Sequence, residues 1–562
     1  MMEKKKRVSK FLDTHLYNFF DLLIILILIS SILIFIFWPI LSVAKQSIYH
    51  DGGFSFNFYK EILKGNKKLI TNGIFVAFLS TFFSIIISIY VAVYISFSES
   101  KIKKLLFIIL MITMISPPFV SSLAYINLFG RRGIITHDIL KLTLNTYGWY
   151  GIVAMQTLSH VSLSSIILSG VISGMDKSII EASLDSGASV NYTIRKVVIP
   201  MMIPGIIVAS LLTFVRCFSD FGTPMIIGGS FNVIATQIYI EIIANGNLPK
   251  AAAMNMLLII PSIIAFMAYR FYMKKSNFTL GGAQKVNSRE MKLRFNGFLG
   301  GLIKIITYTF IFIMVLQYLS IFISAITVYR KGKIYFSLNN IIKLKDYSGS
   351  SFIRSIVYST IAGIIGSFIG MLTAYYTERR KILGMKQVDF IATLPYIIPG
   401  TFFGIGYILA FNDYPMKLTG TAAIVILNCI FKQLPMTTKV SSAVISYIDP
   451  QVEYAGKDCG ASNFFILKDI IIPSLKPAFL MGFINNFTAT MTTIGSIIFL
   501  IYPGQKVATV EMFDAIQSGE YGLGAVIACI IILITLVVNL VFSKLVLGGK
   551  NVSTIKKLSK EF

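Results

Sequence analysis

Long apolar stretches separated by short polar segments occupy most of this sequence. In the first half, runs long enough to cross a membrane as helices lie near residues 19–43, 72–97, 105–129, 149–171, 198–218 and 251–273. In the second half they lie near residues 298–326, 353–376, 387–411, 419–443, 471–491 and 522–547. About 20 apolar residues span the roughly 30 Å of hydrocarbon in a bilayer. Because lipid offers no partner to unpaired backbone groups, the pattern predicts an all-α polytopic membrane protein with about twelve transmembrane helices, six in each half.

The two halves repeat one another. The second span of the first half, at 72–94, reads NGIFVAFLSTFFSIIISIYVAVY, and its counterpart at 354–376 reads RSIVYSTIAGIIGSFIGMLTAYY. The third span of each half carries two closely spaced prolines, Pro117 with Pro118 and Pro395 with Pro399. An even number of spans in each half gives both copies one orientation. Parallel repeats of this kind are related by a pseudo-two-fold axis along the membrane normal, and the transport pathway lies between them.

Composition and charge agree with a membrane protein. The chain has 562 residues, of which 55% are hydrophobic and only 14% charged. The formal net charge is +26, but most Lys and Arg residues lie between spans, which indicates contact with membrane lipid and not with nucleic acid. The first apolar run is too long for a signal peptide, so we expect a retained first helix.

The basic segments also predict the orientation. With the N-terminus inside, the basic residues at 101–104, in the 274–296 linker, at 379–381 and in the C-terminal tail all lie on the cytoplasmic side. We therefore expect both termini in the cytoplasm. The expected outer loops also hold basic residues: Lys67, Lys68, Arg131, Arg132, Arg330 and Lys331.

Residues suited to catalysis or metal binding are scattered. The four cysteines and four histidines form no CxxC, Cys/His or His/carboxylate cluster, so we expect no metal site, no cofactor and no enzyme. The Gly548-Gly549-Lys550 segment lacks the first glycine and the Ser or Thr of a phosphate-binding loop. The chain itself is therefore not expected to bind nucleotide.

A polar segment between the fourth and fifth spans occurs in both halves. In the first half it reads EASLDSGAS from Glu181, and in the second EYAGKDCGAS from Glu453. Alignment on the glycines pairs Ala182 with Ala455, Asp185 with Asp458, Gly187 with Gly460, Ala188 with Ala461, Ser189 with Ser462 and Pro200 with Pro473. The spacing from glycine to proline is the same in both copies.

This repeated segment predicts a short helix that ends at a glycine with positive φ, followed by a second helix that leads into a span. Its small residues allow a partner's backbone to approach closely, and its glutamates offer carboxylates to a partner's Arg or Lys. The alternative is an amphipathic helix that lies on the membrane surface. Two copies with one internal register favour a docking element.

The repeated segment resembles the EAA loop of permease subunits in type I binding-protein-dependent ABC importers with a MetI-like core. The first copy keeps the second glutamate of that pattern and the second copy keeps the first. Ser183 and Gly456 replace the second alanine, and Tyr454 replaces a glutamate. The resemblance covers about residues 70–275 and 351–547, so the chain is expected to consist of two MetI-like halves.

The resemblance implies five regions. They are an N-terminal tail with a peripheral helix and outer loop (1–69), a first permease core (70–275), a linker with the seventh helix and outer loop (276–350), a second core (351–547) and a cytoplasmic tail (548–562). It also implies two copies of an ABC ATPase subunit and an extracytoplasmic solute-binding protein as partners. The implied docking residues are Glu181, Ala182, Asp185, Gly187, Ala188, Glu453, Ala455, Asp458, Gly460 and Ala461.

Fused double cores of this kind resemble permeases for ferric iron, thiamine and 2-aminoethylphosphonate. The segments FSDFGTPMIIGG at 218–229 and MTTIGSIIFL at 491–500 resemble the ferric-iron and aminoethylphosphonate members. Ferric iron is therefore the expected cargo, with 2-aminoethylphosphonate, thiamine or a polyamine as alternatives.

Polar residues in the fifth spans are candidates for the pathway: Arg216, Asp220, Asn485, Asn486 and Thr490. Arg216 and Asp220 are spaced to pair on one helix face, or else both lie at the outer interface. The amide and hydroxyl groups also suit helix packing. An ion-coupled secondary transporter or a membrane scaffold protein are competing interpretations, but neither explains the paired docking elements, and the spans hold few of the carboxylates that an ion-coupled transporter needs.

Overall fold

The computed structural model describes residues 19–50, 52–131, 133–142, 145–275, 291–330, 333–345, 349–380, 382, 384–502 and 504–548. The N-terminal tail, most of the predicted linker and the C-terminal tail lie outside this set. The described chain is helical apart from two short antiparallel hairpins, β1–β2 (Tyr49–His50 and Gly53–Phe54) and β3–β4 (Thr327–Arg330 and Lys333–Phe336).

Within the described residues, eight helices are long and apolar enough to cross a membrane. They are Phe19–Ile48, which contains η1 (Leu33–Phe37) and α2 (Trp38–Ile48); α4 (Lys67–Phe97); α7 (Trp149–Ser173); Val190–Phe218, which comprises α9 (Val190–Thr193), η3 (Ile194–Val198) and α10 (Ile199–Phe218); α13 (Leu248–Lys275); α14 (Gly297–Ala325); α16 (Ser350–Glu378); and α25 (Tyr521–Gly548).

The third span of each half is broken at its prolines. In the first half α5 (Ile102–Ile115) meets the segment Phe119–Ile139, which begins with α6 (Phe119–Phe129), at 110°, and in the second Met385–Tyr396 meets α18 (Gly400–Phe411) at 115°. The former break begins at Ser116, whose ψ of 142° is extended, as expected for the residue before a proline. The second contains α17 (Met385–Thr393) and η4 (Leu394–Tyr396) before the bend. Counting each bent pair as one span gives up to ten.

The two remaining predicted spans form helices that are shorter or less apolar than the other eight. The run at 419–443 is α19 (Ala422–Ile445), whose apolar sequence is interrupted by Asn428, Lys432 and Gln433. The run at 471–491 contains α23 (Lys476–Thr492), which has only 17 residues. Apolar length thus supports eight to ten spans, and the expected twelve stays a prediction.

The order of elements repeats from the first helix of each half onward. The first helix and α14 are each followed by a hairpin and a short helix, α3 (Asn57–Gly65) or α15 (Asn339–Lys343), before the long helices α4 and α16. Toward the end of each half, α12 (Ile234–Ile243) precedes α13 and α24 (Ala508–Gln517) precedes α25. The first half also contains η2 (Ile134–Ile139) and α11 (Gly222–Ile227).

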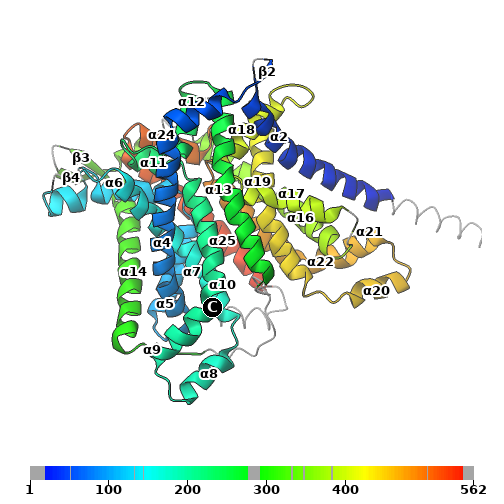
Figure 1. Ribbon diagram of the computed structural model, residues 1–562, viewed down its shortest axis with the longest axis horizontal. Coiled ribbons are helices and arrows are strands. Elements are labelled where there is room, and N and C mark those ends of the chain that lie inside the picture. The colour runs from blue at the N-terminus through cyan, green and yellow to red at the C-terminus, as the bar shows by residue number, and fades with distance from the viewer. Residues whose placement is uncertain are drawn as a thin grey trace, which may run out of the picture.

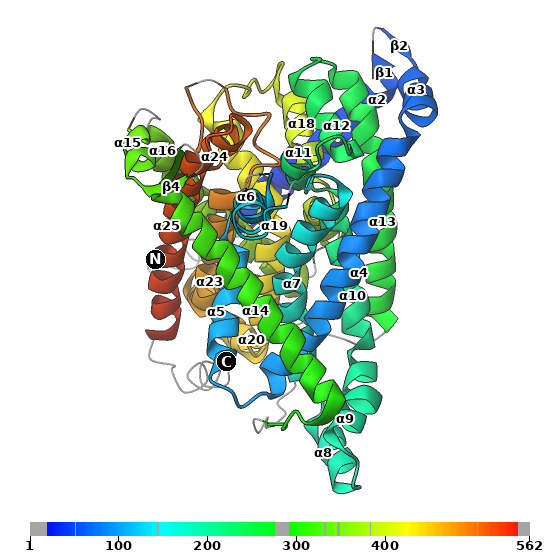
Figure 2. The same cartoon turned by 90° about the vertical axis from the view of Figure 1, so that its left-hand side faces the viewer.

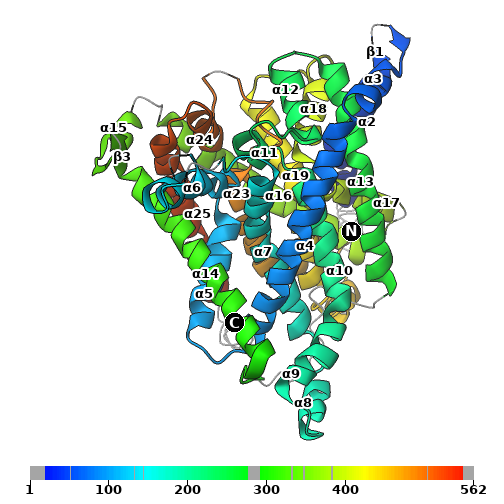
Figure 3. The ribbon, with the colours of Figure 1, turned by 60° about the vertical axis from the view of Figure 1, so that its left-hand side comes forward.

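Each half has a bundle of three helices at its centre, and its first helix packs on the other half. In the first half α4, α7 and α10 pack together, and in the second α16, α19 and α23 do so. The first helix contacts α17, α18 and α19 of the second half as well as α13, whereas α14 contacts α4, α5 and α6 of the first half as well as α25 (Figure 3).

Close approach within the bundles depends on small residues. A Cβ atom at Gly370 would lie 2.4 Å from Thr437 Oγ1, so α16 and α19 meet with almost no side chain between them there. Buried serines on α4 (Ser80, Ser84 and Ser88) have the same effect in the first half. Such small-residue contacts are typical of helices packed in a membrane.

Candidate docking elements and the junction between the halves

The first repeated segment forms the predicted short helix with a glycine stop. Helix α8 runs over Lys177–Asp185, and the Asp176 carboxylate accepts a 3.0 Å hydrogen bond from the Ser178 backbone N–H at its start. Hydrogen bonds from the side chain and backbone of Ser178 lower the pKa of Asp176. At the other end Gly187 has a φ of 83°, a conformation that side-chain-bearing residues rarely adopt.

The hydrogen bonds around Gly187 define a Schellman cap. The Ala188 N–H donates to the Ser183 carbonyl at 3.2 Å and the Gly187 N–H to the Leu184 carbonyl at 2.9 Å. These are the two backbone bonds by which a helix with a left-handed C′ residue satisfies its last carbonyls.

The second segment has the same geometry. Helix α20 runs over Gln451–Asp458, and Gly460 also has a φ of 83°. The Ala461 N–H donates to the Gly456 carbonyl at 3.0 Å and the Gly460 N–H to the Lys457 carbonyl at 2.8 Å. The chain therefore builds the same turn twice.

The chain leaves both turns in the same way. The Ser189 hydroxyl caps α9 by accepting from Tyr192 N–H, and the Ser462 hydroxyl caps α21 (Asn463–Phe465) by accepting from Phe465 N–H. A π-helical segment follows in each half, η3 in the first and η5 (Ile466–Ile471) in the second. Pro200 then lies at the start of α10, and Pro473 at the start of α22 (Ile472–Ser474). Both prolines are at helix positions where a missing N–H costs nothing.

Both docking helices project from the end of the molecule opposite the hairpins (Figures 1 and 2). Beside α8 lies a hollow of about 450 Å³ lined by Ser183, Ser186, Gly187, Ala188, Ser189 and Tyr192. The exposed members of the predicted docking set are Glu181, Ala182, Asp185, Gly187, Ala455, Asp458 and Gly460, while Ala188, Glu453 and Ala461 are partly buried. The structure therefore presents two similar short helices at one end.

The glutamates of the two elements differ in their surroundings. Glu181 is exposed, whereas Glu453 Oε1 lies 3.6 Å from Arg379 Nε at the end of α16, with only 13–14% of either side chain exposed. Arg379 also donates to the carbonyls of Ile445 and Ile448 at the end of α19. The second docking helix is thus tied to its own bundle through a carboxylate that the sequence assigned to a partner protein.

A second ionic contact joins the first helix of the chain to this region. The Asp21 side chain accepts 2.8 Å and 2.9 Å hydrogen bonds from the Tyr376 hydroxyl and from Arg380, and Asp21 is 5% exposed. The Phe20 ring also lies 5.9 Å from the Phe464 ring of α21. Sequence analysis did not identify this junction, although an acidic residue at the start of an apolar run is the signal that marks it.

The start of α14 contacts the first docking element in the corresponding place. A Cβ atom at Gly297 would lie 2.7 Å from the Asn191 amide nitrogen of α9. The Phe295 ring stacks on Tyr94 at the end of α4, with 6.0 Å between ring centroids. Each docking element is therefore contacted by the helix that begins the other half.

Two of the predicted pathway residues are buried between packed helices. On α23, Asn486 is 1% exposed and Thr490 is 7% exposed, and the Asn486 amide approaches the Ala362 carbonyl of α16 at 3.5 Å. Asn485, one residue earlier on α23, is partly buried. Both side chains are therefore buried where helices pack, and their place in the pathway stays a prediction.

Arg216 and Asp220 do not pair. Helix α10 ends at Phe218, and the Asp220 carboxylate accepts hydrogen bonds from Gln156 Nε2 at 3.1 Å and from the N–H groups of Gly222 and Thr223 at 2.9 and 3.2 Å. None of the ion pairs between described residues joins the two side chains. The two side chains do not form the pair that their spacing allows, because α10 ends between them and Asp220 accepts from the first two N–H groups of α11 instead.

Lys432 is a charged residue that sequence analysis missed. It lies near the middle of the 24-residue helix α19, where its ammonium group donates to the carbonyls of Pro395, at 2.8 Å, and Ile398. Both carbonyls belong to the break in the third span. A lysine within an apolar run was the available signal.

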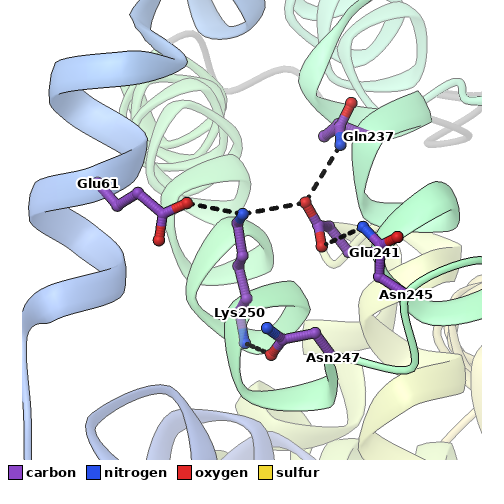
Figure 4. A network of polar contacts seen from close by, with 6 residues as sticks. All are labelled: Glu61, Gln237, Glu241, Asn245, Asn247 and Lys250. Atoms are coloured by element: carbon purple, nitrogen blue, oxygen red, sulfur yellow. Dashed lines mark hydrogen bonds and ion pairs between the residues drawn. The ribbon is translucent and has the colours of Figure 1, made fainter.

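At the hairpin end, a polar network joins α3, α12 and α13 (Figure 4). The Lys250 ammonium lies 2.8 Å from Glu61 Oε1 and 3.2 Å from Glu241 Oε1. Glu241, which is 3% exposed, also accepts hydrogen bonds from Gln237 and Asn245.

A related ion pair joins the corresponding elements of the second half with the charges exchanged. Lys343 of α15 lies 2.8 Å from Glu520, which precedes α25. In the first half the short helix supplies the acid, Glu61, and the last helix supplies the base, Lys250. In each half an ion pair therefore joins the short helix to the last helix or to the residue just before it, and the acid and the base are exchanged between the halves.

Comparison with known proteins agrees with this architecture. Residues 84–276 and 366–546 match the family described as binding-protein-dependent transport system inner membrane components. The ferric transport system permease protein FbpB of Actinobacillus pleuropneumoniae is 31% identical over 449 residues, which are 78% of this chain and 65% of that one. A Haemophilus influenzae protein named for the same ferric transport role, FbpB 1, is 30% identical over 503 residues, 86% of this chain and 78% of its own.

A more distant relative matches about a third of the chain. The sulfate transport system permease protein CysT of Salmonella typhimurium is 23% identical over 185 residues, 31% of this chain and 67% of its own. Two matches to one family in a single chain agree with the repeated order of helices. The chain belongs to the family of binding-protein-dependent transport system inner membrane components, and it is a non-catalytic, multi-pass permease of the inner membrane with two MetI-like domains.

Proposed function

We propose that this chain forms the whole transmembrane pathway of an ATP-driven importer and that its cargo is ferric iron. Its two halves act as pseudo-two-fold-related permease cores of six spans each, bounded at 70–275 and 351–547. Both termini lie in the cytoplasm. A solute-binding protein delivers the cargo at the hairpin end, and the chain itself hydrolyses no ATP.

The observation that carries this proposal is the pair of glycine-capped docking elements. Gly187 and Gly460 have the same φ and the same two backbone hydrogen bonds, and α8 and α20 project from the same end. Two such protrusions suit two copies of one ATPase subunit, each seated on one half. Closure of the ATPase pair on ATP would then move the halves relative to one another.

Ferric iron is preferred as cargo because two relatives that are 30% and 31% identical, matched over 86% and 78% of the chain, are both named for ferric transport. The relative matched over 31% of the chain is named for sulfate transport, so sulfate joins 2-aminoethylphosphonate, thiamine and a polyamine among the alternatives. Uptake of radioactive ferric iron into proteoliposomes holding the chain, its ATPase and its binding protein tests the choice directly.

The docking role is tested with Gly187→Val and Gly460→Val. Each change forces a side chain into a left-handed conformation, at a local cost of roughly 1–2 kcal/mol, and should sharply reduce ATP-dependent uptake and recovery of the ATPase with the chain. The matched control is Gly420→Val, which imposes the same strain at a φ of 82° in the loop between α18 and α19. Wild-type uptake by both docking variants would refute the docking role.

A further inference from the structure

Five aromatic rings, contributed by both halves, form one cluster in the described chain. The members of this aromatic cluster are Phe119, Phe221 and Tyr239 from the first half and Phe499 and Phe513 from the second. The Phe513 ring centroid lies 5.0 Å from that of Phe119 and 6.3 Å from that of Phe221. The Tyr239 centroid lies 6.0 Å from both rings of the second half. At such separations aromatic rings attract one another, so the halves touch here through ring-to-ring contacts.

Tyr239 and Phe513 occupy the same position in the two halves. Each is the sixth residue of a ten-residue helix, α12 or α24, that follows a valine, and in both cases the N–H four residues after that valine donates to its carbonyl at 3.1 Å. The two rings touch each other, with 82° between their planes. In an arrangement with two-fold symmetry, a residue meets its own equivalent only beside the axis. The proposed pseudo-two-fold axis therefore passes by this pair, and the pathway between such repeats follows the same axis.

The aromatic cluster is closely packed. Phe119 and Phe513 are 1% exposed, and Phe221 is 4% exposed. A Cβ atom at Gly222 would lie 2.0 Å from Phe119 Cε1, and one at Gly495 would lie 3.5 Å from Phe221 Cε1. The rings thus pack on bare backbone of both halves, at Gly222 in the first and at Gly495 in the second. An apolar constriction of this kind excludes water and ions without any charged group.

Each of the two helices at the centre of the cluster is fastened to its own half. Glu241 of α12 lies 3.2 Å from the Lys250 ammonium of α13 (Figure 4). Glu511 of α24 accepts a 2.6 Å hydrogen bond from the Ser351 hydroxyl at the start of α16. Polar contacts therefore hold each helix to its own half, whereas ring contacts join the two helices to one another. When the halves move apart at this level, the rings must part with them.

The aromatic cluster and the docking elements lie at opposite ends of the molecule. Helices α6, α12 and α24 are close to the hairpin end, and α8 and α20 are at the other end (Figures 1 and 2). Closure of the ATPase pair would draw the two docking elements together. Halves that rock about their middle then separate at the hairpin end.

We propose that the aromatic cluster is the outer gate of the pathway, closed in this structure, and that its rings part to admit the cargo. This inference rests on the proposed importer function and assigns the control of entry to particular residues. The gate is closed while the ATPase subunits are apart and opens when ATP draws the docking elements together. Tyr239 and Phe513 separate on opening because they belong to different halves, whereas ring pairs within one half stay together.

The first experiment follows the gate and needs no transport. The double variant Tyr239→Cys with Phe513→Cys is purified with its ATPase in nanodiscs and treated with a short bifunctional methanethiosulfonate, whose cross-link a reductant reverses. Peptide mass spectrometry identifies the joined cysteines, since the chain has four of its own. The introduced pair should be joined rapidly in the nucleotide-free complex. ATP with vanadate should slow this reaction by about tenfold or more, because the closed state becomes a minor one.

The matched control is Phe75→Cys with Trp149→Cys. Their rings lie 5.5 Å apart on α4 and α7 of the same half, so nucleotide should leave their rate of cross-linking unchanged. An unchanged rate for the gate pair in a complex that hydrolyses ATP overturns the gate. Absence of ATPase activity from the wild-type complex refutes instead the importer function on which the gate rests.

The second experiment measures uptake of radioactive ferric iron into proteoliposomes that hold the chain, its ATPase and its binding protein. Cross-linking of the gate pair should abolish ATP-dependent uptake, and reductant should restore it. The cross-linked control pair should import as it does before cross-linking. Uptake that survives complete cross-linking of the gate pair overturns the gate. If the wild type takes up no iron, the proposed cargo fails, while the cross-linking rates still decide the gate.

Discussion

Asp21 connects the first helix to the second half through two hydrogen bonds. Its carboxylate contacts Tyr376 and Arg380 at the end of α16, and the neighbouring Arg379 contacts Glu453 of the docking helix. A charge this well buried is tolerable only when it is paired, and removal of one partner leaves the other uncompensated. The residue therefore fixes the start of the first helix beside the second docking element.

We expect Asp21→Asn to destabilise the chain and to weaken the coupling of ATP hydrolysis to uptake. Breaking a buried ion pair costs about 3 kcal/mol or more, so thermal unfolding should begin at lower temperature and ATP-dependent uptake should fall. Adding Arg380→Gln should restore part of the loss, because it removes the uncompensated charge. Asp138→Asn is the matched control, since Asp138 pairs with His137 in an exposed position, where a pair contributes less than about 1 kcal/mol. Equal effects of the two Asp→Asn variants would contradict this role.

Glu241 makes the hairpin end sensitive to acid. Burial acts to raise the pKa of Glu241, but hydrogen bonds from Asn245, Gln237 and Lys250 outweigh it, so that the pKa lies below its usual range. A carboxylate with a lowered folded-state pKa stabilises the fold above its unfolded-state pKa, and this stabilisation is lost as pH falls through the lowered value.

Acidification from about pH 6 to about pH 3 should therefore lower the unfolding temperature of the wild type more than that of Glu241→Gln. Thermal unfolding of the purified chain across this pH range is the measurement. Glu99→Gln removes an exposed carboxylate just after α4 and should leave the wild-type response unchanged. A Glu241→Gln variant as acid-sensitive as the wild type would contradict the assignment.

Among the elements, the docking helices were the most predictable and the hairpins the least. A glycine after a short amphipathic segment, followed by Ser and later by Pro, specifies its own cap and the start of the next helix, and the structure forms both. Strands of two to four residues leave no periodic pattern, so the hairpins after the first helix and α14 were missed. The prolines at 117–118 and 395–399 indicated bends, but the angles of 110° and 115° depend on what packs around them.

The candidate site was predictable only as far as its residues act locally. Gly187 and Gly460 act through their own backbone conformation, and both have the positive φ that the sequence predicted. The pairing of Glu453 with Arg379 joins segments about 74 positions apart, and no local pattern specifies it. Lys432 and Asp21 could have been noticed as isolated charges in apolar runs, but no local pattern specifies the distant residues that they contact.

The two docking elements should respond differently to loss of their glutamates. Glu453→Gln removes the contact with Arg379, so backbone amide exchange in α20 should become faster even without the ATPase. Glu181→Gln should leave exchange in α8 unchanged and weaken ATPase binding, because Glu181 is exposed. Hydrogen-exchange mass spectrometry and ATPase binding measured on both variants test the difference, and identical behaviour would contradict it.

At the scale of the whole molecule, the halves are interlocked. The first helix packs on α17, α18 and α19, and α14 packs on α4, α5 and α6. Each docking element also touches the helix that begins the opposite half. Under the proposed mechanism, movement of one docking element would therefore displace helices of both halves.

This interlocking also has a consequence for biosynthesis, because the first helix is made long before the residues that it contacts. The partners of Asp21 lie 355 and 359 residues farther along the chain. At about 5–20 residues per second, the ribosome needs roughly 20 to 70 s to deliver them. During that interval the first helix waits in the lipid with its carboxylate unsatisfied, so a chain that stops before Tyr376 leaves an acidic membrane helix for quality-control proteases to remove.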